Sequence, residues 1–238
     1  MNIALLGYGK MGKTIDELAS RMGHKVVLKI NADNAHERSV KNIKNADVAI
    51  EFSRPETAFD NVQFCIQNGV PVVSGTTAWL DQMEAAKVLC RKQGGAFFYA
   101  SNFSVGVNIF FALNRYLAEM MRNQESYEVK MTEIHHTQKL DAPSGTAISL
   151  AKDILQKLDR KTEWVNKKTT ESSKLEITSE RVEEVPGTHL VQYLSPIDQI
   201  DIQHIAHSRE GFARGAILAA EWLIGKEGYF EMSDLLGF

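Results

Sequence analysis

Hydrophobic positions in the first hundred residues follow two alternating patterns. Short, largely apolar runs predict strands at 3–6, 25–30, 47–52, 71–74 and 96–100. Between them, apolar residues spaced three and four positions apart predict helices at 10–22, 57–68 and 80–92. Gly23, Gly69 and Gly94 follow these helical segments as stop signals. Strands that alternate with helices predict an open, doubly wound α/β sheet.

The pattern changes near residue 104. A long apolar segment predicts a helix at 105–121, and amphipathic segments predict helices at 146–158 and 215–224. Strict alternation predicts strands with one solvent-facing side at 127–135, 188–193 and 199–207. The polar segment at 161–174 is expected to be a loop. We therefore expect a second domain of α+β type, with a mostly antiparallel sheet covered by helices.

Composition and charge exclude several classes of protein. The chain has 238 residues, 27 Lys+Arg and 30 Asp+Glu, which gives a formal net charge of −3. With this charge and no basic block, nucleic acid is not an expected partner. No segment reaches the ~20 apolar residues of a membrane helix, and the first residues lack the pattern of a secretory signal. Cys65 and Cys90 have no metal-ligand or redox spacing, which favours reduced thiols and a cytoplasmic protein.

A glycine-rich loop follows the first predicted strand. The segment Gly7-Tyr8-Gly9-Lys10-Met11-Gly12 fits the G-x-G-x-x-G pattern and opens a predicted helix. A dinucleotide pyrophosphate must approach backbone N–H groups at a helix N-terminus, where side chains would block it. We expect a Rossmann-like dinucleotide-binding domain at 1–104, completed by 215–238, and a substrate-binding and oligomerisation domain at 105–214. The alternative is a tight strand-to-helix turn that binds no ligand.

The residue after the second strand bears on the choice of cofactor. Dinucleotide-binding folds often place an Asp or Glu there to hold the adenosine ribose, but this chain has Asn31. Asn31 can hydrogen-bond a ribose hydroxyl without repelling a 2′-phosphate, and Lys10 and Lys29 lie nearby in the sequence. The sequence therefore does not choose between NADH and NADPH.

A second set of reactive residues lies at 133–147. His135 and His136 end a predicted strand, Lys139 follows, and a helix opens with Ser144 or Thr146 available as its cap. A helix N-terminus beside a lysine and a histidine can hold a carboxylate and supply acids for proton transfer. The same residues could form an ordinary helix start with one solvated histidine. A metal site is not expected, because no third ligand has suitable spacing.

Residues 133–147 closely resemble the signature of the 4-hydroxy-tetrahydrodipicolinate reductase family of bacterial lysine biosynthesis, also called dihydrodipicolinate reductase. Their pattern is Glu-x-His-His-x-x-Lys-x-Asp-Ala-Pro-Ser-Gly-Thr-Ala. Four other segments resemble the family in the same order along the chain, at 51–56, 75–77, 100–108 and 212–216. The resemblance implies an NAD(P)H-dependent reductase with a Rossmann domain and a substrate domain, assembled as a homotetramer.

The resemblance also implies roles for individual residues. His135 would be the proton donor or acceptor, and Lys139 the proton donor. The carboxylates of the substrate, a small cyclic imine, would be bound by His136, Gly145 and Thr146. The implied contacts with NADH or NADPH come from three loops: Gly7, Tyr8, Gly9, Lys10, Met11, Gly12, Gly75, Thr76, Thr77, Ala100, Ser101, Asn102 and Phe103. The position after the second strand adds Asn31 as a candidate.

Three features depart from the family pattern. The glycine loop is one residue shorter than usual, with Lys10 where an arginine is common. Asn31 stands where an acidic residue is common, and the stretch between Val191 and His204 is shorter than in many members. These departures bear on cofactor preference and assembly, not on the reaction.

Two other functions fit part of the sequence. A different two-domain dehydrogenase, acting on an amino acid or a semialdehyde, would explain the glycine loop but not the His-His-Lys segment. A non-catalytic dinucleotide sensor would need the glycine loop, but it would not need Lys139 beside two histidines. Oxidation of NADH or NADPH by hydroxy-tetrahydrodipicolinate, compared with aspartate semialdehyde, separates these functions.

Overall fold

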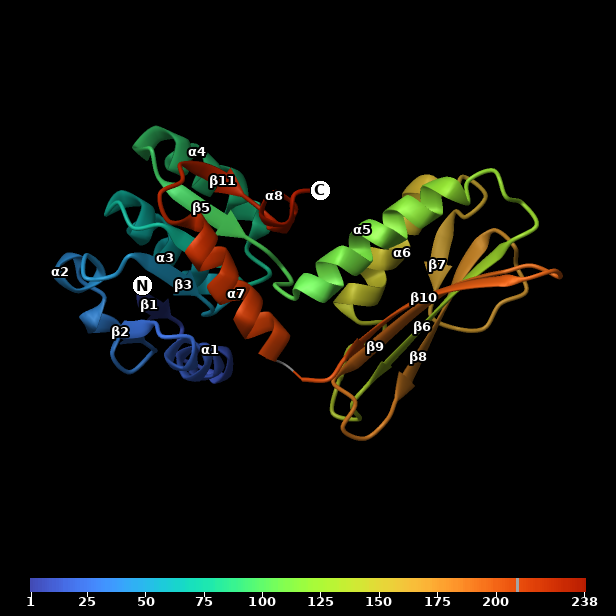
Figure 1. Cartoon of the computed structure of the whole chain (residues 1–238), viewed down its shortest axis with the longest axis horizontal. Coiled ribbons are helices and arrows are strands. Elements are labelled where there is room, and N and C mark those ends of the chain that lie inside the picture. Colours follow the sequence, from blue (N-terminus) through green and yellow to red (C-terminus); the bar gives the residue numbers. More distant parts are fainter. Residues whose placement is uncertain (209) are drawn as a thin grey trace. The chain divides into compact units, whose positions relative to one another are not determined.

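The computed structural model describes residues 1–208 and 210–238 (Figure 1). The chain divides into two compact units. The first unit joins Met1–Val105 to Glu210–Phe238, and the second is the segment from Gly106 onward that separates them in the sequence. No helix among the described residues has both the length and the apolar character needed to span a membrane.

The first unit is built on a parallel sheet, to which its described residues contribute six strands in the order β11-β5-β4-β3-β1-β2. These strands are β1 (Asn2–Leu6), β2 (Lys25–Ile30), β3 (Val48–Glu51), β4 (Val72–Ser74), β5 (Ala96–Tyr99) and β11 (Gly228–Phe230). The helices are α1 (Lys10–Arg21), α2 (Val40–Ile43), α3 (Pro55–Gln67), α4 (Met83–Gln93), α7 (Glu210–Leu223) and α8 (Met232–Leu236), with short 3-10 turns at Ala35–Glu37 and Leu80–Gln82. Because β1 lies between β2 and β3, the strand order reverses there, which makes the loop after β1 the usual place for a ligand.

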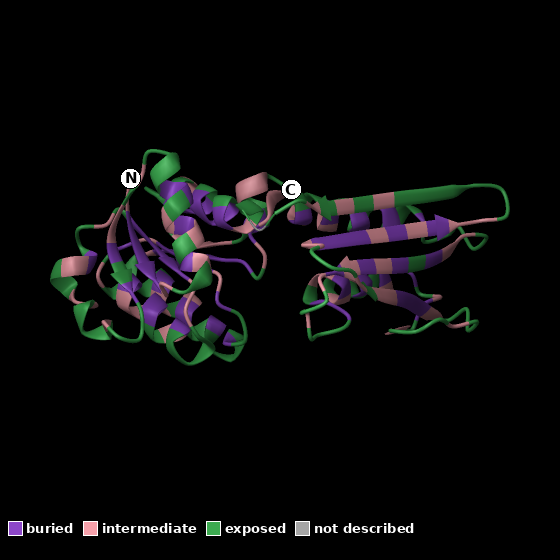
Figure 2. Ribbon diagram, turned by 90° about the horizontal axis from the view of Figure 1, so that it is seen from below, coloured by how far each residue is buried: buried purple, intermediate pink, exposed green. Residues whose placement is uncertain are grey.

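Alternate residues of β1 point into two separate hydrophobic clusters. Ile3 and Leu5 pack with α1 and α7 on one face of the sheet. Ala4 and Leu6 pack with α3 and α4 on the other face. Figure 2 shows these central strands as buried along most of their length. Burial on both faces accounts for the apolar run in the sequence, and the predicted doubly wound, Rossmann-like sheet is confirmed.

The second unit contains a mixed sheet, for which its described residues give the order β10-β9-β6-β8-β7. The strands are β6 (Glu128–His135), β7 (Glu163–Val165), β8 (Lys174–Arg181), β9 (Gly187–Leu194) and β10 (Gln199–Ala206). Strand β9 pairs antiparallel with β10 and β6, whereas β8 pairs parallel with β6 and β7. Helices α5 (Val105–Met120) and α6 (Gly145–Lys157) form one hydrophobic cluster with the sheet. One buried face and one wetter face explain the alternation in the sequence.

The main differences from the sequence expectations are short or polar elements. The expected loop at 161–174 contains β7, which has only three residues, too few for alternation to show. Strand β8 has few apolar positions, and its pairing with both β6 and β7 holds it in place. Helix α7 begins at Glu210, whereas the sequence predicted a start at 215. The prediction missed the first residues because they include glycine and charged residues and show no apolar periodicity.

Helix α7 approaches the segment after β5 so closely that only glycine fits at one position. A Cβ atom built on Gly215 would lie 1.8 Å from the carbonyl oxygen of Phe103. Gly211, one turn earlier on the same helix, would place a Cβ no closer than 3.7 Å, to Ser104 Oγ. The absence of a side chain at Gly215 therefore lets α7 pack closely against the backbone at Phe103.

We predict that Gly215→Ala destabilises the first unit by about 1–3 kcal/mol or more, because the helix or the segment at Phe103 must move. Gly211→Ala is the matched control, since it has space for the methyl group and gains helix propensity of up to about 1 kcal/mol. Chemical denaturation of both variants measures the difference. Equal free energies of unfolding for the two variants would show that the close approach does not constrain the fold.

Candidate active site

The glycine loop begins with a residue in the left-handed backbone region. Gly7 has φ +106, and a Cβ there would lie 2.0 Å from the carbonyl oxygen of Phe52. The N–H groups of Gly7 and Tyr8 both donate to the carbonyl of Ile30, at 2.9 and 2.8 Å. These bonds fasten the loop to the end of β2, so the first glycine is required by the turn itself.

The other two glycines of the loop differ in what surrounds them. A Cβ on Gly12 would lie 2.4 Å from the carbonyl oxygen of Gly7, so this residue permits close packing of α1 on the loop. A Cβ on Gly9 would meet nothing within 4 Å. Gly9 is the N-cap of α1 and makes no side-chain capping bond. The N-terminus of α1 can therefore receive an anionic group at Gly9.

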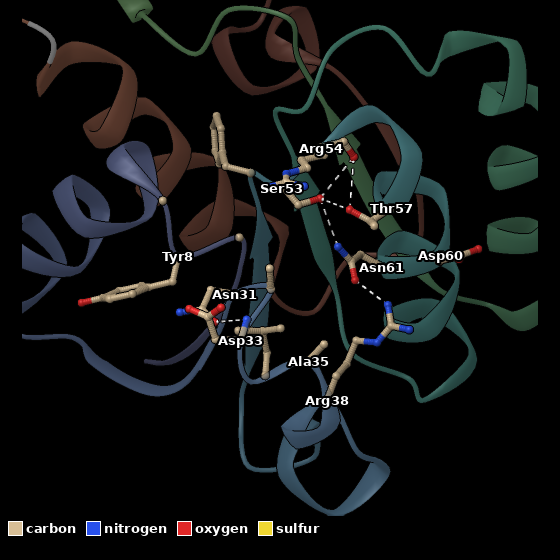
Figure 3. A pocket seen from close by; sticks show the side chains of 15 residues that line it. Tyr8, Asn31, Asp33, Ala35, Arg38, Ser53, Arg54, Thr57, Asp60 and Asn61 are labelled. Carbon is tan, nitrogen blue, oxygen red and sulfur yellow. Dashed lines mark hydrogen bonds between the residues drawn. The ribbon is translucent and has the colours of Figure 1, made fainter.

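A cavity of about 550 Å³ lies beside this loop (Figure 3). Its lining combines backbone of the glycine loop with side chains that follow β2 and β3: Gly7, Tyr8, Gly9, Ile30, Asn31, Ala32, Asp33, Ala35, Arg38, Phe52, Ser53, Arg54, Thr57, Asp60 and Asn61. Four residues that the sequence predicts for cofactor binding are among them, namely Gly7, Tyr8, Gly9 and Asn31. Lys10 and Met11 lie in the first turn of α1 instead.

Asn31 has a structural task at the rim of the cavity. Its side-chain oxygen accepts from the N–H groups of Asp33 and Asn34, at 2.8 and 3.1 Å, and so closes the turn after β2. Lys29 forms an ion pair with Asp16, with Nζ 2.7 Å from Oδ2. The side chain that adds positive charge to the cavity near the end of β2 is that of Arg38.

Arg38 was not among the residues predicted for the site. Its Nη1 donates to Asn61 Oδ1 at 2.5 Å, and its guanidinium lies 5.3 Å from the centre of the Phe64 ring. Figure 3 shows this side chain reaching toward Asn61 from the segment that follows β2. The dinucleotide-binding fingerprint places its ribose-binding residue at the end of the second strand. Arg38 lies several residues beyond that position, so the fingerprint does not predict it.

A buried carboxylate organises the loops after β3 and β4. Glu51 is 0% exposed, and its Oε1 accepts from Ser53 N at 2.9 Å and Thr76 Oγ1 at 2.9 Å. Its Oε2 accepts from Ser74 Oγ at 2.7 Å. Thr76 Oγ1 in turn accepts from Ser53 N at 2.8 Å. An acid inside an apolar strand was the signal in the sequence that could have drawn attention to Glu51.

The other predicted cofactor residues lie in two loops of the same unit. Gly75 follows β4, and a Cβ there would lie 2.2 Å from the Phe52 ring. Ala100 follows β5, with its N–H 3.2 Å from the Ser74 carbonyl, and the Phe103 ring stacks 5.9 Å from Phe98. The remaining members are Thr77, Ser101 and Asn102, which continue these loops. All of them follow the carboxyl ends of neighbouring parallel strands, where this class of sheet binds ligands.

The second unit carries the histidines and the lysine. Alternation along β6 turns Glu133 and His135 to the same buried face, and the Nδ1 of His135 lies 2.8 Å from Glu133 Oε2. Strand pairing places His189 of β9 directly opposite Glu133, and Arg181 of β8 opposite His135. Arg181 Nη2 donates to Glu133 Oε1 at 3.2 Å. Strand register thus gathers residues that are 46 to 56 positions apart in the sequence.

His189 connects this group to the start of α6. Its ring lies 5.1 Å from that of His135 in an edge-to-face arrangement, and its Nε2 is 3.1 Å from Ser144 Oγ. Ser144 is the N-cap of α6 and accepts from the Ala147 N–H at 3.1 Å. Of the two capping residues that the sequence left open, Ser144 takes the position, and Gly145 and Thr146 form the first turn.

Lys139 lies on the loop between β6 and α6. Its Nζ contacts both carboxylate oxygens of Asp141, at 2.8 and 2.9 Å. Arg181 Nη2 donates to the Asp141 carbonyl at 2.7 Å, which ties this loop to β8. His136 directly follows the end of β6. The structure therefore brings His135, Lys139 and the α6 N-terminus to one end of the second unit.

Electrostatics differ sharply within this group. Burial raises the pKa of Glu133, but hydrogen bonding to His135, Ser144 and Ser179 outweighs it and holds that pKa well below its usual range. Burial lowers the pKa of His189 from its ordinary 6.5 to about 4, with a further contribution from the charge of His135. The structure thus favours a charged Glu133 beside a neutral His189.

Glu133, His135 and His189 together form a group of three possible metal ligands, which spacing in the sequence did not reveal. Ligand atoms of these three residues lie within 4.8 Å of one another. The Arg181 guanidinium contacts the same carboxylate. Because a cation already neutralises Glu133, a divalent metal would meet repulsion there, and we assign the carboxylate to ion pairing.

The first unit has the sheet and glycine loop of dinucleotide-dependent oxidoreductases, and the second has side chains that can exchange protons, His135 and Lys139. The class is therefore a two-domain, dinucleotide-dependent reductase. Family models give the particular family: the dihydrodipicolinate reductase N-terminus matches residues 1–103, and the dihydrodipicolinate reductase C-terminus matches residues 106–236. The chain belongs to the dihydrodipicolinate reductase family.

Individual relatives agree with this assignment. The chain is 51% identical over 236 residues to the 4-hydroxy-tetrahydrodipicolinate reductase of Christiangramia forsetii, covering 99% of this chain and 98% of the relative. The fold matches a dipicolinate-bound dihydrodipicolinate reductase from Paenisporosarcina sp. TG-14, with TM-score 0.76, 20% identity and 98% coverage of both chains. An aspartate dehydrogenase from Thermotoga maritima has TM-score 0.51 at 13% identity, covering 95% of this chain and 97% of that one, which indicates a shared fold alone.

We predict that Gly9→Ala leaves the fold intact but weakens dinucleotide binding by at least about 10-fold, because the methyl group enters the space that a pyrophosphate needs. Fluorescence titration with NADPH and NADH measures the affinity, and thermal unfolding measures the stability. Gly12→Ala is the comparison variant, which should lower stability as well, since its Cβ would meet the Gly7 carbonyl. Unchanged affinity in a folded Gly9→Ala protein would contradict a pyrophosphate at this residue.

We also predict an acid-dependent loss of stability from His189. Its pKa is lowered in the folded state, so the unfolded chain binds more protons, and the free energy of unfolding falls as pH drops from 6.5 toward 4. Between about pH 7.5 and about pH 5 this group should cost about 2 kcal/mol. His189→Gln should reduce the pH dependence by that amount in denaturation experiments. An identical pH dependence in the variant would show that His189 titrates normally.

Proposed function

We propose that this protein is an NAD(P)H-dependent reductase that converts (2S,4S)-4-hydroxy-2,3,4,5-tetrahydrodipicolinate to (S)-2,3,4,5-tetrahydrodipicolinate with loss of water. This reaction belongs to the diaminopimelate route of lysine biosynthesis. The observation that carries the proposal is the sequence identity of 51% over nearly the whole chain to a reductase with this substrate in its name. The first unit serves as the dinucleotide-binding domain, and the second as the substrate-binding and oligomerisation domain.

Bound NADH or NADPH supplies the hydride that reduces C4 of the dehydrated ring. The chain must hold this cofactor, and the glycine loop at the N-terminus of α1 is suited to its pyrophosphate. Arg38 lies in the adjoining cavity and can face either an adenine ring or a 2′-phosphate. Asp33 and Asp60 line the same cavity, and their carboxylates could accept a hydrogen bond from a ribose hydroxyl. Both NADH and NADPH are therefore proposed as cofactors.

The second unit binds the dianionic substrate and supplies the proton. Reduction at C4 sends negative charge toward the ring nitrogen, and a proton must be added in the same turnover. His135 and Lys139 are the acids at this end of the unit, and general acid catalysis contributes roughly 10²–10⁴-fold. Free N–H groups in the first turn of α6, at Gly145 and Thr146, together with His136, are suited to the carboxylates.

The assembly and location follow the family expectation. We propose a homotetramer, in which the second unit provides the contacts between subunits, and a cytoplasmic location without a nucleic-acid or membrane partner. Both cysteines, Cys65 and Cys90, are free and buried, and burial raises the pKa of each thiol. Thiols of this kind suit a reducing compartment.

The direct test is oxidation of NADPH and NADH by freshly generated hydroxy-tetrahydrodipicolinate, with aspartate semialdehyde as the comparison substrate. We predict that His135→Ala and Lys139→Ala each lower kcat by at least about 10-fold while cofactor affinity is retained. Lys139→Ala should also raise KM for the substrate, because it removes positive charge near a dianion. Lys130 is exposed on β6, the strand that carries His135, and Lys130→Ala is a control expected to keep activity near wild type.

Absence of cofactor oxidation with hydroxy-tetrahydrodipicolinate would exclude the proposed reaction. Wild-type kinetics in both the His135 and Lys139 variants would keep the reaction but overturn the proposed proton donors. Oxidation with aspartate semialdehyde alone would favour the other two-domain dehydrogenases.

A further inference from the structure

We propose that Glu133 is a positioning residue for the reaction, holding the His135 ring through Nδ1 so that Nε2 is the nitrogen that exchanges a proton with the substrate. This inference rests on the proposed function, in which His135 donates or accepts that proton. Neither the family resemblance nor the glycine loop assigns a task to this carboxylate.

The position of Glu133 in the sheet makes it the centre of the group. It lies on β6 between β8 and β9, and it is 0% exposed. Its Oε2 is 2.8 Å from His135 Nδ1, and its Oε1 is 3.2 Å from Arg181 Nη2. A buried carboxylate without partners would cost several kcal/mol. The carboxylate therefore lies between the His135 ring and the Arg181 guanidinium, and the hydrogen bond from Arg181 holds it there.

The contact at Nδ1 determines which side of the His135 ring can react. A charged carboxylate favours a proton on Nδ1, so the acid–base exchange is left to Nε2. A Cβ built on Gly187 would lie 3.1 Å from Nε2 and 3.3 Å from Cδ2 of this ring. Glycine at 187 thus leaves space at the edge of the ring that carries Nε2. The two ring nitrogens therefore have different tasks: Nδ1 faces the Glu133 carboxylate, and Nε2 is left to exchange a proton with the substrate.

The second contact of Glu133 keeps the carboxylate from moving with the ring. Arg181 is itself held in place, because the same Nη2 also donates to the Asp141 carbonyl and Nη1 donates to the Glu180 carbonyl, each at 2.7 Å. His189 packs edge-to-face against the ring at 5.1 Å and closes a further direction of movement. A carboxylate that orients a catalytic imidazole through one nitrogen is a known way to fix its tautomer. Here the sheet supplies that carboxylate two residues before the histidine.

The kinetic test compares Glu133→Gln with Glu180→Gln. Glutamine keeps the size of the side chain but removes the charge that selects the tautomer. We expect Glu133→Gln to lower kcat by about 10–100-fold, with the substrate KM changed by no more than about 3-fold. Affinity for NADPH should be unchanged, because the cofactor loop belongs to the other unit. Glu180 is exposed on the neighbouring strand β8, and its variant should retain wild-type kcat.

Two further measurements separate positioning from a merely structural effect. In a His135→Ala background, Glu133→Gln should lower kcat by no more than about 2-fold, because a residue that acts through His135 has nothing left to position. Nitrogen-15 NMR of the His135 side chain, recorded on the folded protein without substrate, should show a proton on Nδ1 in the wild type. Glu133→Gln should shift this ring toward a mixture of tautomers, and Glu133→Asp should partly restore both the tautomer and kcat.

Each outcome has a distinct meaning. Wild-type kcat in Glu133→Gln, an unchanged tautomer, or a full additional loss in the His135→Ala background would overturn the positioning role. A wild-type protein that does not reduce hydroxy-tetrahydrodipicolinate would overturn the proposed function instead, while the NMR comparison would still decide whether Glu133 orients the ring. Thermal unfolding of each variant confirms that the measured protein is folded.

Discussion

The contact between Glu133 and its neighbours is the constraint on which the second unit depends. A carboxylate that is 0% exposed is stable only when its partners are fixed, and strands β6 and β8 supply those partners, His135 and Arg181. A slip of one residue between β6 and its neighbours would turn the carboxylate to the other face of the sheet and leave Arg181 without it. The need of this carboxylate for a charged partner therefore favours one strand register, and that register positions His135, the proposed proton donor or acceptor.

The two units offer their proposed ligands the same kind of site. In the first unit, loops after parallel strands meet the N-terminus of α1, where Gly9 leaves the backbone accessible. In the second, His135 and Arg181 end the parallel strands β6 and β8, and α6 begins nearby at Ser144. Each arrangement concentrates N–H groups and a partial positive charge where an anionic ligand is expected. A pyrophosphate and a dicarboxylate both suit such sites.

Local patterns were enough to predict the glycine loop, the α/β order and the His-His-Lys segment, because each lies in a short stretch of sequence. The residues that complete the sites depend on long-range pairing. Arg38 reaches the cavity from outside the fingerprint, and His189 meets Glu133 only through the β6–β9 register. Strand β8, which carries Arg181, has too few apolar positions for its pattern to predict a strand, although its neighbours hold it in the sheet. Tertiary pairing, not local preference, determines these features.

A net charge near zero is compatible with a binding site for a dianion, because the cations at this site are paired with carboxylates of the same chain. Lys139 is paired with Asp141, a carboxylate whose side chain is 61% exposed. An ion pair with one exposed partner contributes only about 0–1 kcal/mol. Asp141 can leave Lys139 at little cost, because the aspartate returns to water. Glu133 differs, since its burial makes loss of its partners expensive. This end of the second unit therefore combines an exchangeable ion pair on the loop after β6 with a buried one on β6 and β8 that is suited to holding His135 in place.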